Sequence, residues 1–444
     1  MTLVLALACT GPRVASSTKF PTVSDVSISA DPNVATMLWV SWSQDVPGNG
    51  ASVGYALDGT EQPAMTVAAS AGPNRVAIVG IPAETAVDVT LDECGSADPA
   101  SCGSAALGSA TTGSLPTDLV TPDLTSYQAD GTAPWKFLLT SVEVGPGSFD
   151  GSFYTVILDD LGRVVWYRLT TGLRMTLFPR VAVNGSQLLI DETTNFVDGA
   201  PGIARVTLDE LTDDESTAAP IGFSYSEGED GSIYFDEDVT ETQFYLDRLR
   251  PDGTLDRIWD CYAWVSAWNT DPYGCGANEV QYDEAHHSVL WSDFGTSTVA
   301  EIDAETGALI RYFGETPGGY AIDPSDIHLR LQHSPVWTPS GSLLLTTHDP
   351  SHLAAQVIRE FSIDDAAQTA TQIWSYQNPS GYYGMEEGDV SRFDNGDTLI
   401  GYGVAGIIEQ IDANSNVLAV LDWHSKLTGH MTEIADLSPL IGNP

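Results

Sequence analysis

Three of the eight histidines in this 444-residue chain lie in the segment LQHSPVWTPSGSLLLTTHDPSH, residues 331–352. His333 precedes one run that is typical of a β-strand, and His348 follows the next such run, SLLLTT. An antiparallel hairpin would bring both imidazoles to the same end of a sheet. Because neutral imidazole is a nucleophile and a general base near pH 7, the pattern indicates group transfer or acid–base chemistry centred on His333. The alternative is that these are ordinary solvated histidines in loops.

The same segment offers donor atoms of the types that bind zinc, in His348, Asp349 and His352. Their spacing differs from the helical H-E-x-x-H zinc motif, and Pro350 indicates a turn. The chain also lacks the D-x-[DN]-x-[DN]-G pattern of a calcium loop. We therefore expect no metal and no cofactor.

Acidic and histidine residues further along the chain provide weaker candidates. Glu386, Glu387 and Asp389 could supply a general acid and base for a glycan. His430 could approach the same region from the C-terminal segment, although a surface position is expected. A surface position is also expected for the remaining histidines outside this region, His286, His287 and His424. Aromatic residues in CYAWVSAWNTDPYGC and GYYG could form a platform for a ring, with ordinary packing as the alternative.

The elements that must position these residues are short strands. No stretch keeps a helical apolar period for more than two or three turns. From Trp135 onward, six units share the order strand, polar turn, strand, loop, strand, polar turn, strand, at intervals of about 40–55 residues. Such a period of four short strands is typical of β-propeller blades. We predict an all-β chain with a six-bladed propeller, and seven blades is the main alternative division.

A smaller β unit precedes the repeats. Residues 20–112 contain strand-length apolar runs separated by turn residues, which predicts a β-sandwich that resembles fibronectin type III modules. A segment rich in Ser, Thr and Pro, residues 113–132, is predicted to be a linker to the propeller at 133–444. Residues 1–19 are interpreted as a signal and lead segment.

The five cysteines indicate an oxidising compartment. Cys94 and Cys102 form one close pair and Cys261 and Cys275 another, each across a loop containing Gly or Pro, as expected of disulfides. Cys9 ends the run LVLALAC, which resembles a bacterial lipobox, so lipidation at Cys9 is expected. We predict an extracytoplasmic protein, either a lipoprotein of the cell envelope or a periplasmic or secreted protein.

The charge balance restricts the partners. Lys and Arg number 17 against 61 Asp and Glu, a formal net charge of −44. Nucleic acid and anionic membrane surfaces would be repelled over most of the surface. Because no stretch reaches the roughly 18 apolar residues of a membrane span, contact with a membrane is expected only through a lipid anchor.

Three segments carry a family resemblance: NEVQYDEAHHSVLWSDFGTSTVAEIDAETGALIRYFG, LQHSPVWTPSGSLLLTTHDPS and GDVSRFDNGDTLIGYGVAGIIEQID. They resemble successive blades of the bacterial arylsulfotransferases, which are secreted six-bladed propellers with an N-terminal β-sandwich. The resemblance implies transfer of a sulfuryl group from an aryl sulfate to a phenol through a sulfohistidine, without metal or nucleotide. It also implies a small phenolic or aryl sulfate ligand.

The family's catalytic residues are matched only in part. The pair Gln332–His333 corresponds to the family's Gln-His, which implies that His333 is the nucleophile. Asn278 is kept, but the family's histidine two residues earlier is a glycine, and the arginine after the next strand is absent. Arg180 is the one cation in the matching part of the second unit. His348 and His328 are further possible neighbours of the site.

Two functions are compatible with these residues. The first is an arylsulfotransferase-like enzyme with a degenerate or rebuilt site, because loss of charge-stabilising groups costs several powers of ten in rate. The second is a non-catalytic surface propeller that binds a ligand or a partner protein at the mouth of its channel.

Overall fold

The computed structural model describes residues 21–442 except 48–49, 58, 63, 95–101, 146–148, 150, 171–173, 195–201, 210–214, 241–242, 269–273, 350–351, 383 and 385. It also leaves out the side chains of some strand residues, among them Cys94, Cys102, Asp349 and His352. The described part is nearly all β, with one short helix, α1 (Cys261–Val265), and two 3-10 turns, η2 (Gly403–Ala405) and η3 (Ser438–Leu440). The prediction of an all-β chain is confirmed. No helix of the described residues is long and apolar enough to cross a membrane.

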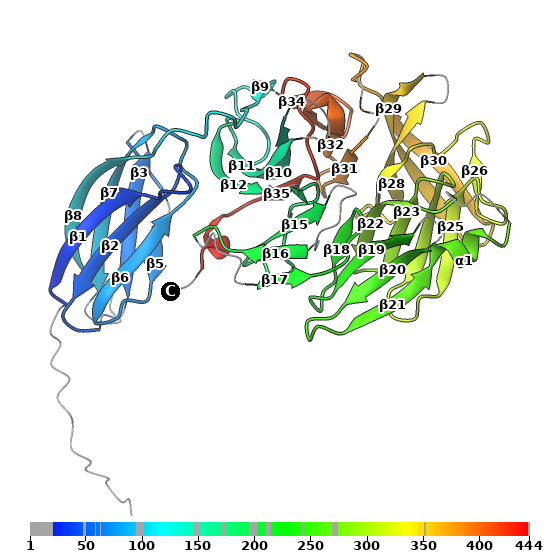
Figure 1. Cartoon of the computed structure of the whole chain (residues 1–444). Helices are drawn as coiled ribbons and strands as arrows, with labels where there is room; N and C mark the ends of the chain where they lie inside the picture. Colours follow the sequence, from blue (N-terminus) through cyan, green and yellow to red (C-terminus); the bar gives the residue numbers. More distant parts are fainter. Residues whose placement is uncertain are drawn as a thin grey trace, which may run out of the picture.

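The N-terminal unit consists of two antiparallel sheets (Figure 1). One contains β1 (Val23–Ala30), β2 (Leu38–Gln44) and β6 (Gly72–Ile78). The other contains β3 (Ala51–Leu57), β4 (Thr60–Glu61), β5 (Met65–Val67), β7 (Ala86–Cys94) and β8 (Cys102–Thr111). In β2, every second side chain is buried, and Leu38, Val40 and Trp42 pack with Val53 and Val89 of the facing sheet in one hydrophobic core.

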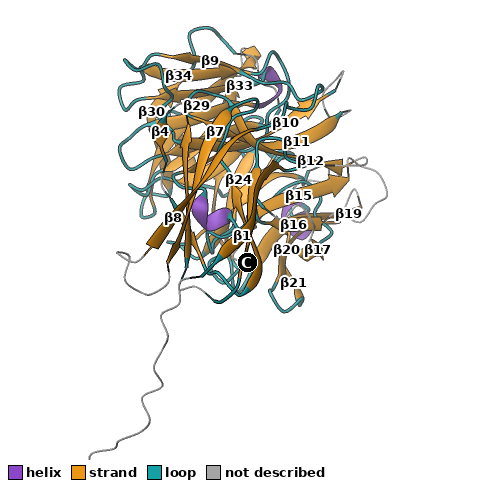
Figure 2. Ribbon diagram, turned by 90° about the vertical axis from the view of Figure 1, so that its left-hand side faces the viewer, coloured by secondary structure: helices purple, strands orange, loops and turns teal. Residues whose placement is uncertain are grey.

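Six further sheets follow (Figures 1 and 2), and we number them I to VI. Sheet I contains β10 (Phe137–Val144), β11 (Ser152–Asp159), β12 (Val164–Thr170) and β35 (Thr432–Ile434). Sheet II contains β13 (Arg174–Met175), β14 (Arg180–Val181), β15 (Leu188–Thr194), β16 (Gly202–Val206) and β17 (Glu215–Ala218). Sheet III contains β18 (Tyr225–Glu227), β19 (Ile233–Thr240), β20 (Gln243–Leu249) and β21 (Leu255–Asp260).

The other three sheets continue the same order. Sheet IV contains β22 (Ala277–Asp283), β23 (Ser288–Asp293), β24 (Thr298–Asp303) and β25 (Leu309–Gly314). Sheet V contains β26 (Ala321–Asp323), β27 (His333–Trp337), β28 (Leu343–Asp349), β29 (His352–Asp364) and β30 (Thr369–Tyr376). Sheet VI contains β31 (Gly388–Arg392), β32 (Thr398–Tyr402), β33 (Ile407–Ile411), β34 (Val417–Asp422) and β9 (Asp123–Ser126).

Hydrophobic cores join the sheets into a closed ring. Each sheet from I to V shares a buried apolar cluster with the next, as where Leu290 of sheet IV packs with Leu343 of sheet V. The cluster that joins sheets I and II also contains Leu399 and Ile408 of sheet VI, so the last sheet packs on the first. A lone four-stranded sheet cannot cover both of its faces, and this ring covers them all.

Strand pairing fixes both ends of the part of the chain that forms the ring. The C-terminal strand β35 pairs antiparallel with β10, and β9 pairs antiparallel with β34. The structure therefore differs from the sequence prediction at residues 113–132, because four of these residues form an edge strand of sheet VI. Without β9, the outer edge of β34 would carry unpaired backbone groups, and β9 pairs with them.

Strands β22, β27 and β31, each at one edge of its sheet, meet at the centre of the ring, next to the residue before β18. Val280 N of β22 donates to Ser224 Oγ, just ahead of β18, at 3.0 Å. Ser334 N of β27 donates to Glu279 Oε2 of β22 at 2.6 Å, and Ser334 Oγ donates to Asp389 Oδ1 of β31 at 2.6 Å. These bonds bring side chains from sheets III to VI to one axis, where a functional site would gather them.

Candidate functional site

Buried aspartates fix the loops that lead into the central strands. Asp191 of β15 accepts hydrogen bonds from the backbone N–H groups of Leu177 and Phe178, at 2.7 and 2.9 Å. Asp236 of β19 does the same for the loop before β18, and Asp293 of β23 for the loop before β22. All three are fully buried. Each loop is thereby held in one conformation at the centre of the ring.

A cavity of about 540 Å³ opens at this end of the ring axis. Most of its lining is apolar, and the polar groups come from His333, Asn278 and two glutamates. The full lining is Phe149, Met175, Phe223, Asn278, Phe294, Leu331, His333, Glu386 and Glu387. Because these residues come from sheets II to VI and from the loop after β10, the cavity depends on the ring being closed.

The imidazole of His333 lies in the wall of this cavity, and the residue is 7% exposed. None of the described residues makes a hydrogen bond to its ring. Burial, together with the nearby His348, lowers the pKa of His333 to about 3, so the ring is neutral at physiological pH. A neutral imidazole without a protein partner can accept a hydrogen bond or act as a nucleophile.

The backbone around His333 is strained. Leu331 and Ser334 have positive φ angles of 49° and 50°, which non-glycine residues seldom adopt, and the pairing of β27 with β28 is shifted between His333 and Val336. Both polar groups of Ser334 are hydrogen-bonded, the backbone N–H to Glu279 and the hydroxyl to Asp389. These bonds hold the bulge that turns His333 towards the cavity.

Gln332, predicted next to the nucleophile, has a positioning role. Its side chain is fully buried, and Nε2 donates to the carbonyl oxygens of Asp293 and Thr298 at 2.7 and 3.1 Å. The backbone carbonyl oxygen of Gln332 accepts hydrogen bonds from Asn278 Nδ2 at 2.5 Å and from Ser292 Oγ at 3.0 Å. Gln332 therefore ties the loop before His333 to sheet IV, while Asn278 itself lines the cavity.

A second group of polar residues lies on the axis, and we call Arg180, Glu279, Asp389 and His430 the axial cluster. His430 Nδ1 lies 2.9 Å from Asp389 Oδ2, and Arg180 Nη2 lies 3.6 Å from Glu279 Oε1. Arg180 Nη1 donates to Gln281 Oε1 at 2.8 Å. Glu279 and Asp389 are 2% and 4% exposed, so this is a largely desolvated charge network.

The electrostatics of the carboxyl groups are uneven. Burial is the main cause that raises the pKa of Glu279 to about 8, and the negative charge of Asp389 adds to it. Burial is also the main cause that raises the pKa of Glu387 well above its usual value, and the charge of Glu279 adds to it. Although burial alone would raise the pKa of Asp389, the adjacent His430 and the hydrogen bond from Ser334 hold it below its usual value. At neutral pH, the pKa of about 8 keeps Glu279 mostly protonated, whereas Asp389 is ionised.

Several predicted site neighbours lie elsewhere. His328 is half-exposed and its Nδ1 lies 2.6 Å from Glu315 Oε1, so the structure does not bring it to the cavity. His348 is buried close enough to lower the pKa of His333, although it does not line the cavity. Arg180 is not among the lining residues, and its Nη2 lies 3.6 Å from Glu279 Oε1. The zinc alternative at His348, Asp349 and His352 involves side chains outside the described residues.

The expected surface position of His430 is wrong. Its side chain is 12% exposed and paired with Asp389, because Gly429 and His430 follow the last strand of sheet VI and pass over the axis before β35 closes the ring. The backbone N–H of His430 donates to the carbonyl of Leu177 at 2.7 Å. Glu279 was missed because it is one of four polar residues in NEVQYD, so the sequence gives no signal that sets it apart.

The remaining expectations have mixed outcomes. His286, His287 and His424 have exposed side chains, as predicted. Trp264 packs in a tilted arrangement against Trp259 and edge-to-face against Trp268, at ring separations of 5.5 and 6.0 Å, and none of the three lines the cavity. Tyr382 likewise packs on Tyr402, at 5.2 Å.

The cysteine predictions are confirmed for one pair. Cys261 and Cys275 form a disulfide with a Cα separation of 6.1 Å. Cys94 and Cys102 are opposite each other in the pairing of β7 with β8, but their side chains are outside the described residues, so that disulfide stays a prediction. Cys9 also lies outside the described residues.

Metal-ligating groups occur at two places among the described residues. One is Cys261, Cys275 and Asp293, where the disulfide uses both sulfur atoms. The other is Glu279, Asp389 and His430 of the axial cluster, whose ligand atoms lie within 4.8 Å of one another.

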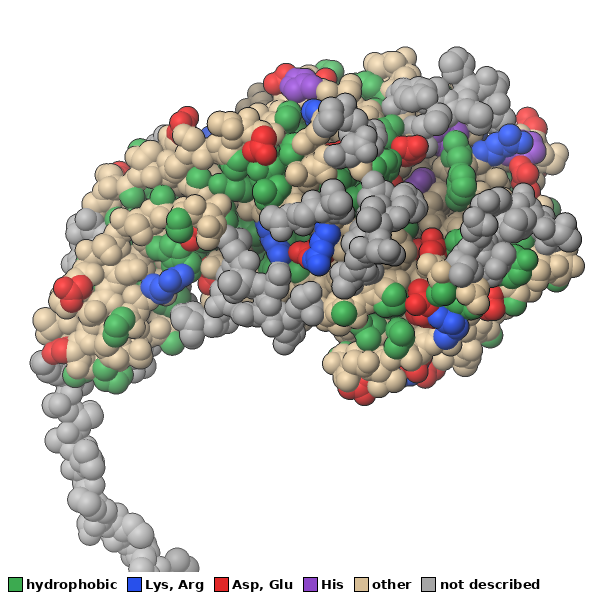
Figure 3. Space-filling view, in the orientation of Figure 1, with side chains coloured by type: hydrophobic (Ala, Val, Ile, Leu, Met, Phe, Trp, Pro, Cys, Tyr) green, Lys and Arg blue, Asp and Glu red, His purple; other side chains and the backbone are tan. Residues whose placement is uncertain are grey.

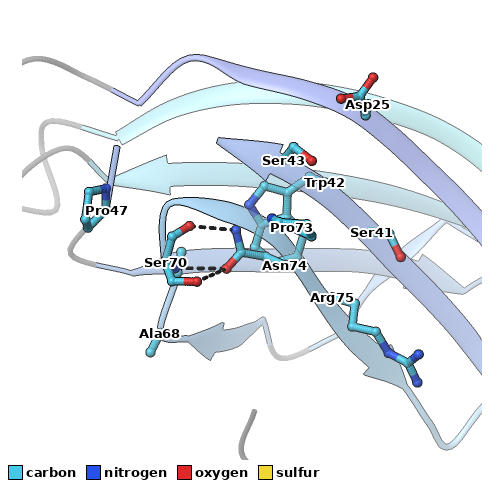
Figure 4. A pocket seen from close by; sticks show the side chains of 11 residues that line it. Asp25, Ser41, Trp42, Ser43, Pro47, Ala68, Ser70, Pro73, Asn74 and Arg75 are labelled. Atoms are coloured by element: carbon cyan, nitrogen blue, oxygen red, sulfur yellow. Dashed lines mark hydrogen bonds between the residues drawn. The ribbon is translucent and has the colours of Figure 1, made fainter. Parts of the chain in front are cut away.

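A second hollow, of about 650 Å³, lies on the N-terminal unit (Figure 4). Trp42, Pro73 and Arg75 are among its lining residues. Asn74 and Ser70 hydrogen-bond to each other there, at 2.9 Å, so these polar groups are already satisfied. Unlike the axial cavity, the hollow gathers no cluster of unpartnered titratable groups.

Acidic side chains are distributed widely over the surface. On the face in Figure 3, Asp and Glu occur over both the N-terminal unit and the ring, whereas Lys and Arg occupy few places. This agrees with the formal charge of −44. The acidity is thus a property of the whole surface and does not by itself mark the site.

No protein-family model and no curated protein matches the chain. Solved structures of β-propeller-like proteins are similar in part. A protein of unknown function from Bacteroides caccae is 13% identical, with 68% of this chain and 100% of that chain covered and a TM-score of 0.46. TolB from Acinetobacter baumannii is 12% identical, with 80% of both chains covered and a TM-score of 0.44. Virginiamycin B lyase from Staphylococcus aureus is 12% identical, with 71% and 100% covered and a TM-score of 0.40.

These likenesses identify no function for this chain. The identities and TM-scores are low, and none of the three structures is an arylsulfotransferase. The assignment of an all-β ring rests on the sheet topology and on the apolar clusters shared between sheets, and the resemblance to the arylsulfotransferases stays a prediction.

Proposed function

We propose that the chain binds a small aromatic molecule in the axial cavity, with His333 as the polar anchor. The observation that carries the proposal is a buried imidazole, without a hydrogen-bond partner among the described residues, in the wall of an otherwise mainly apolar cavity. Small-molecule sites typically combine an apolar lining with a few converging polar groups. Phe149, Phe223 and Phe294 supply aromatic surface, and the neutral ring of His333 can accept a hydrogen bond from a phenolic hydroxyl.

The charge of the lining favours a neutral phenol over an anion. Among the described residues of the lining, Glu386 and Glu387 are the titratable ones besides His333, and none is a Lys or an Arg. An anionic ligand would be repelled by carboxylate charge and would find no cation among these residues. A neutral phenol avoids that repulsion and still meets the imidazole.

Sulfuryl transfer is the second candidate, favoured by the same unpartnered imidazole. An imidazole nitrogen of His333 would attack the sulfur of an aryl sulfate, and the sulfur–oxygen bond to the departing phenolate would break. The sulfuryl group would then pass from the histidine to a phenol, which gives up its proton. Developing negative charge needs donors or cations, and among the lining residues Asn278 is the one side-chain amide.

One experiment separates the two functions. Calorimetry measures binding of 4-cresol and of 4-nitrophenyl sulfate to the wild type, to His333→Ala and to the control His287→Ala, whose side chain is 68% exposed. We expect 4-cresol to bind more tightly than the sulfate, and binding to weaken in His333→Ala alone. Release of nitrophenol in the presence of cresol, lost in His333→Ala, would establish transfer. Absence of binding by both compounds would refute the proposed function.

We also infer that the protein works outside the cytoplasm. The support is the disulfide between Cys261 and Cys275, since disulfides persist mainly in oxidising compartments. Mass spectrometry of the mature protein from its native cells, without reduction, tests this inference. Free thiols at both positions would contradict it. The same spectrum reports whether Cys9 carries a lipid.

A further inference from the structure

We propose that Glu279, Asp389 and His430 of the axial cluster form a binding site for one divalent transition-metal ion. One ligand atom from each residue lies within 4.8 Å of the other two. Two carboxylate oxygens and one imidazole nitrogen are donors suited to Zn²⁺ or Mn²⁺. The site lies behind the cavity, and the proposal does not depend on whether an aromatic ligand binds there.

The ligand atoms are available. Glu279 Oε1 is buried and accepts no hydrogen bond from the described residues, because the nearest cation, Arg180 Nη2, is 3.6 Å away. His430 Nδ1 is 2.9 Å from Asp389 Oδ2, yet the contact lacks hydrogen-bond geometry. A buried carboxylate oxygen without a hydrogen bond is costly unless another group binds it. An ion between the three side chains would bind Glu279 Oε1 and would replace the direct contact of His430 with Asp389.

Hydrogen bonds hold two of the three ligand residues in place. Ser334 donates its backbone N–H to Glu279 Oε2 and its hydroxyl to Asp389 Oδ1, each at 2.6 Å. The backbone N–H of Met431 donates to Asp389 Oδ2 at 2.8 Å. Contacts of this kind orient the ligands of metal sites in general. They leave Glu279 Oε1 without a hydrogen bond, and an oxygen of Asp389 would bind the ion through its second lone pair.

The charge balance admits a cation. When metal is bound, Glu279 and Asp389 contribute two negative charges, and Arg180 supplies one positive charge nearby. Arg180 is directed to Gln281 through Nη1, and its Nε and Nη2 make no hydrogen bond with the described residues. The guanidinium group therefore makes no hydrogen bond to Glu279, and its positive charge partly offsets the negative charge of the two carboxylates beside the ion.

The position of the site suggests what an ion would do. Asn278, which lines the cavity, precedes Glu279, and Glu387 precedes Asp389 by two residues. Three protein ligands leave coordination positions open for water or for a polar group of a ligand. The ion would thus lie between the ring core and the cavity.

The test uses the full-length protein, freed of metal by dialysis against a chelator. Calorimetry measures the binding of Zn²⁺, Mn²⁺ and Ca²⁺ to the wild type, Asp389→Asn and His430→Gln. A matched control is His286→Gln, because His286 Nδ1 lies 2.7 Å from Asp283 Oδ2 in a surface pair of the same kind. We expect one Zn²⁺ or Mn²⁺ per chain, weakened about 100-fold or more in both axial variants and unchanged in the control.

A second measurement does not depend on the folding of the variants. Anomalous diffraction at the zinc edge, from crystals grown with Zn²⁺, should place an ion between Glu279, Asp389 and His430. Binding by Ca²⁺ alone, ions at surface histidines alone, or equal affinity in the wild type and both axial variants would overturn the proposal. If the wild type binds the metal but neither cresol nor the aryl sulfate, the proposed function is refuted and the proposed metal site stands.

Discussion

Acidification should destabilise the protein through His333. Burial and the nearby His348 lower the pKa of this histidine from 6.5 to about 3. A group whose pKa is lowered by folding contributes its full stability above the unfolded value and loses it as the pH falls towards the folded value. The loss is about 1.4 kcal/mol per pH unit below 6.5. Between pH 7.5 and 5, His333 should therefore remove about 2 kcal/mol from the free energy of unfolding.

The variant His333→Gln isolates this contribution, because glutamine stays neutral over the whole range. Urea denaturation followed by circular dichroism gives the free energy of unfolding at both pH values for the wild type and the variant. The wild type should lose about 2 kcal/mol more than the variant. His287→Gln, at an exposed position, should behave as the wild type does. Equal losses in the wild type and His333→Gln would refute the buried, neutral imidazole on which the proposed function depends.

Three further outcomes are expected from the same kind of measurement. Burial raises the pKa of Asp191 to about 6, so the free energy of unfolding of the wild type should fall by about 3 kcal/mol as the pH rises from 4 to 8. The variant Asp191→Asn should not show this fall, and parallel pH profiles of the two proteins would contradict the prediction. In Gly429→Ala, the added Cβ would overlap the carbonyl oxygen of Leu177. The overlap should lower the free energy of unfolding by about 1–3 kcal/mol and displace the segment before β35. An unchanged melting temperature would argue against that close approach. Replacing Cys261 and Cys275 by serine should lower the stability by about 3 kcal/mol, and an equally stable double variant would show that the loop needs no cross-link.

The sequence was sufficient to predict the all-β class, because alternating apolar residues between turns identify strands wherever they occur. It also singled out His333, one of the residues that line the cavity, through the resemblance of Gln332–His333 to the Gln-His pair of the arylsulfotransferases. The role of Gln332 in tying two sheets together could not be read from its position, since its partners Asp293 and Thr298 are more than thirty residues away in the sequence.

The axial cluster shows where local patterns fail. His430 was expected at the surface as part of the closing segment, but β35 pairs with β10 and carries the preceding residues across the centre of the ring. That pairing joins residues almost three hundred positions apart. β9 was missed for the same reason, because a short edge strand in a polar segment is stabilised by the free edge of β34 and not by its own composition.

Position separates the structural carboxyl groups of the ring centre from those beside the cavity. Asp191, Asp236 and Asp293 are fully buried, and each accepts backbone N–H groups from the loop that it fixes. Glu279 also accepts a backbone N–H, from Ser334, and leaves one oxygen without a hydrogen bond, as Asp236 does. Glu387 lines the cavity and receives no hydrogen bond to its carboxyl group from the described residues. Burial without donors makes such a carboxyl group destabilising. Because Glu387 lines the cavity and Glu279 follows the lining residue Asn278, the simplest physical account of their burial is a ligand or ion that completes them.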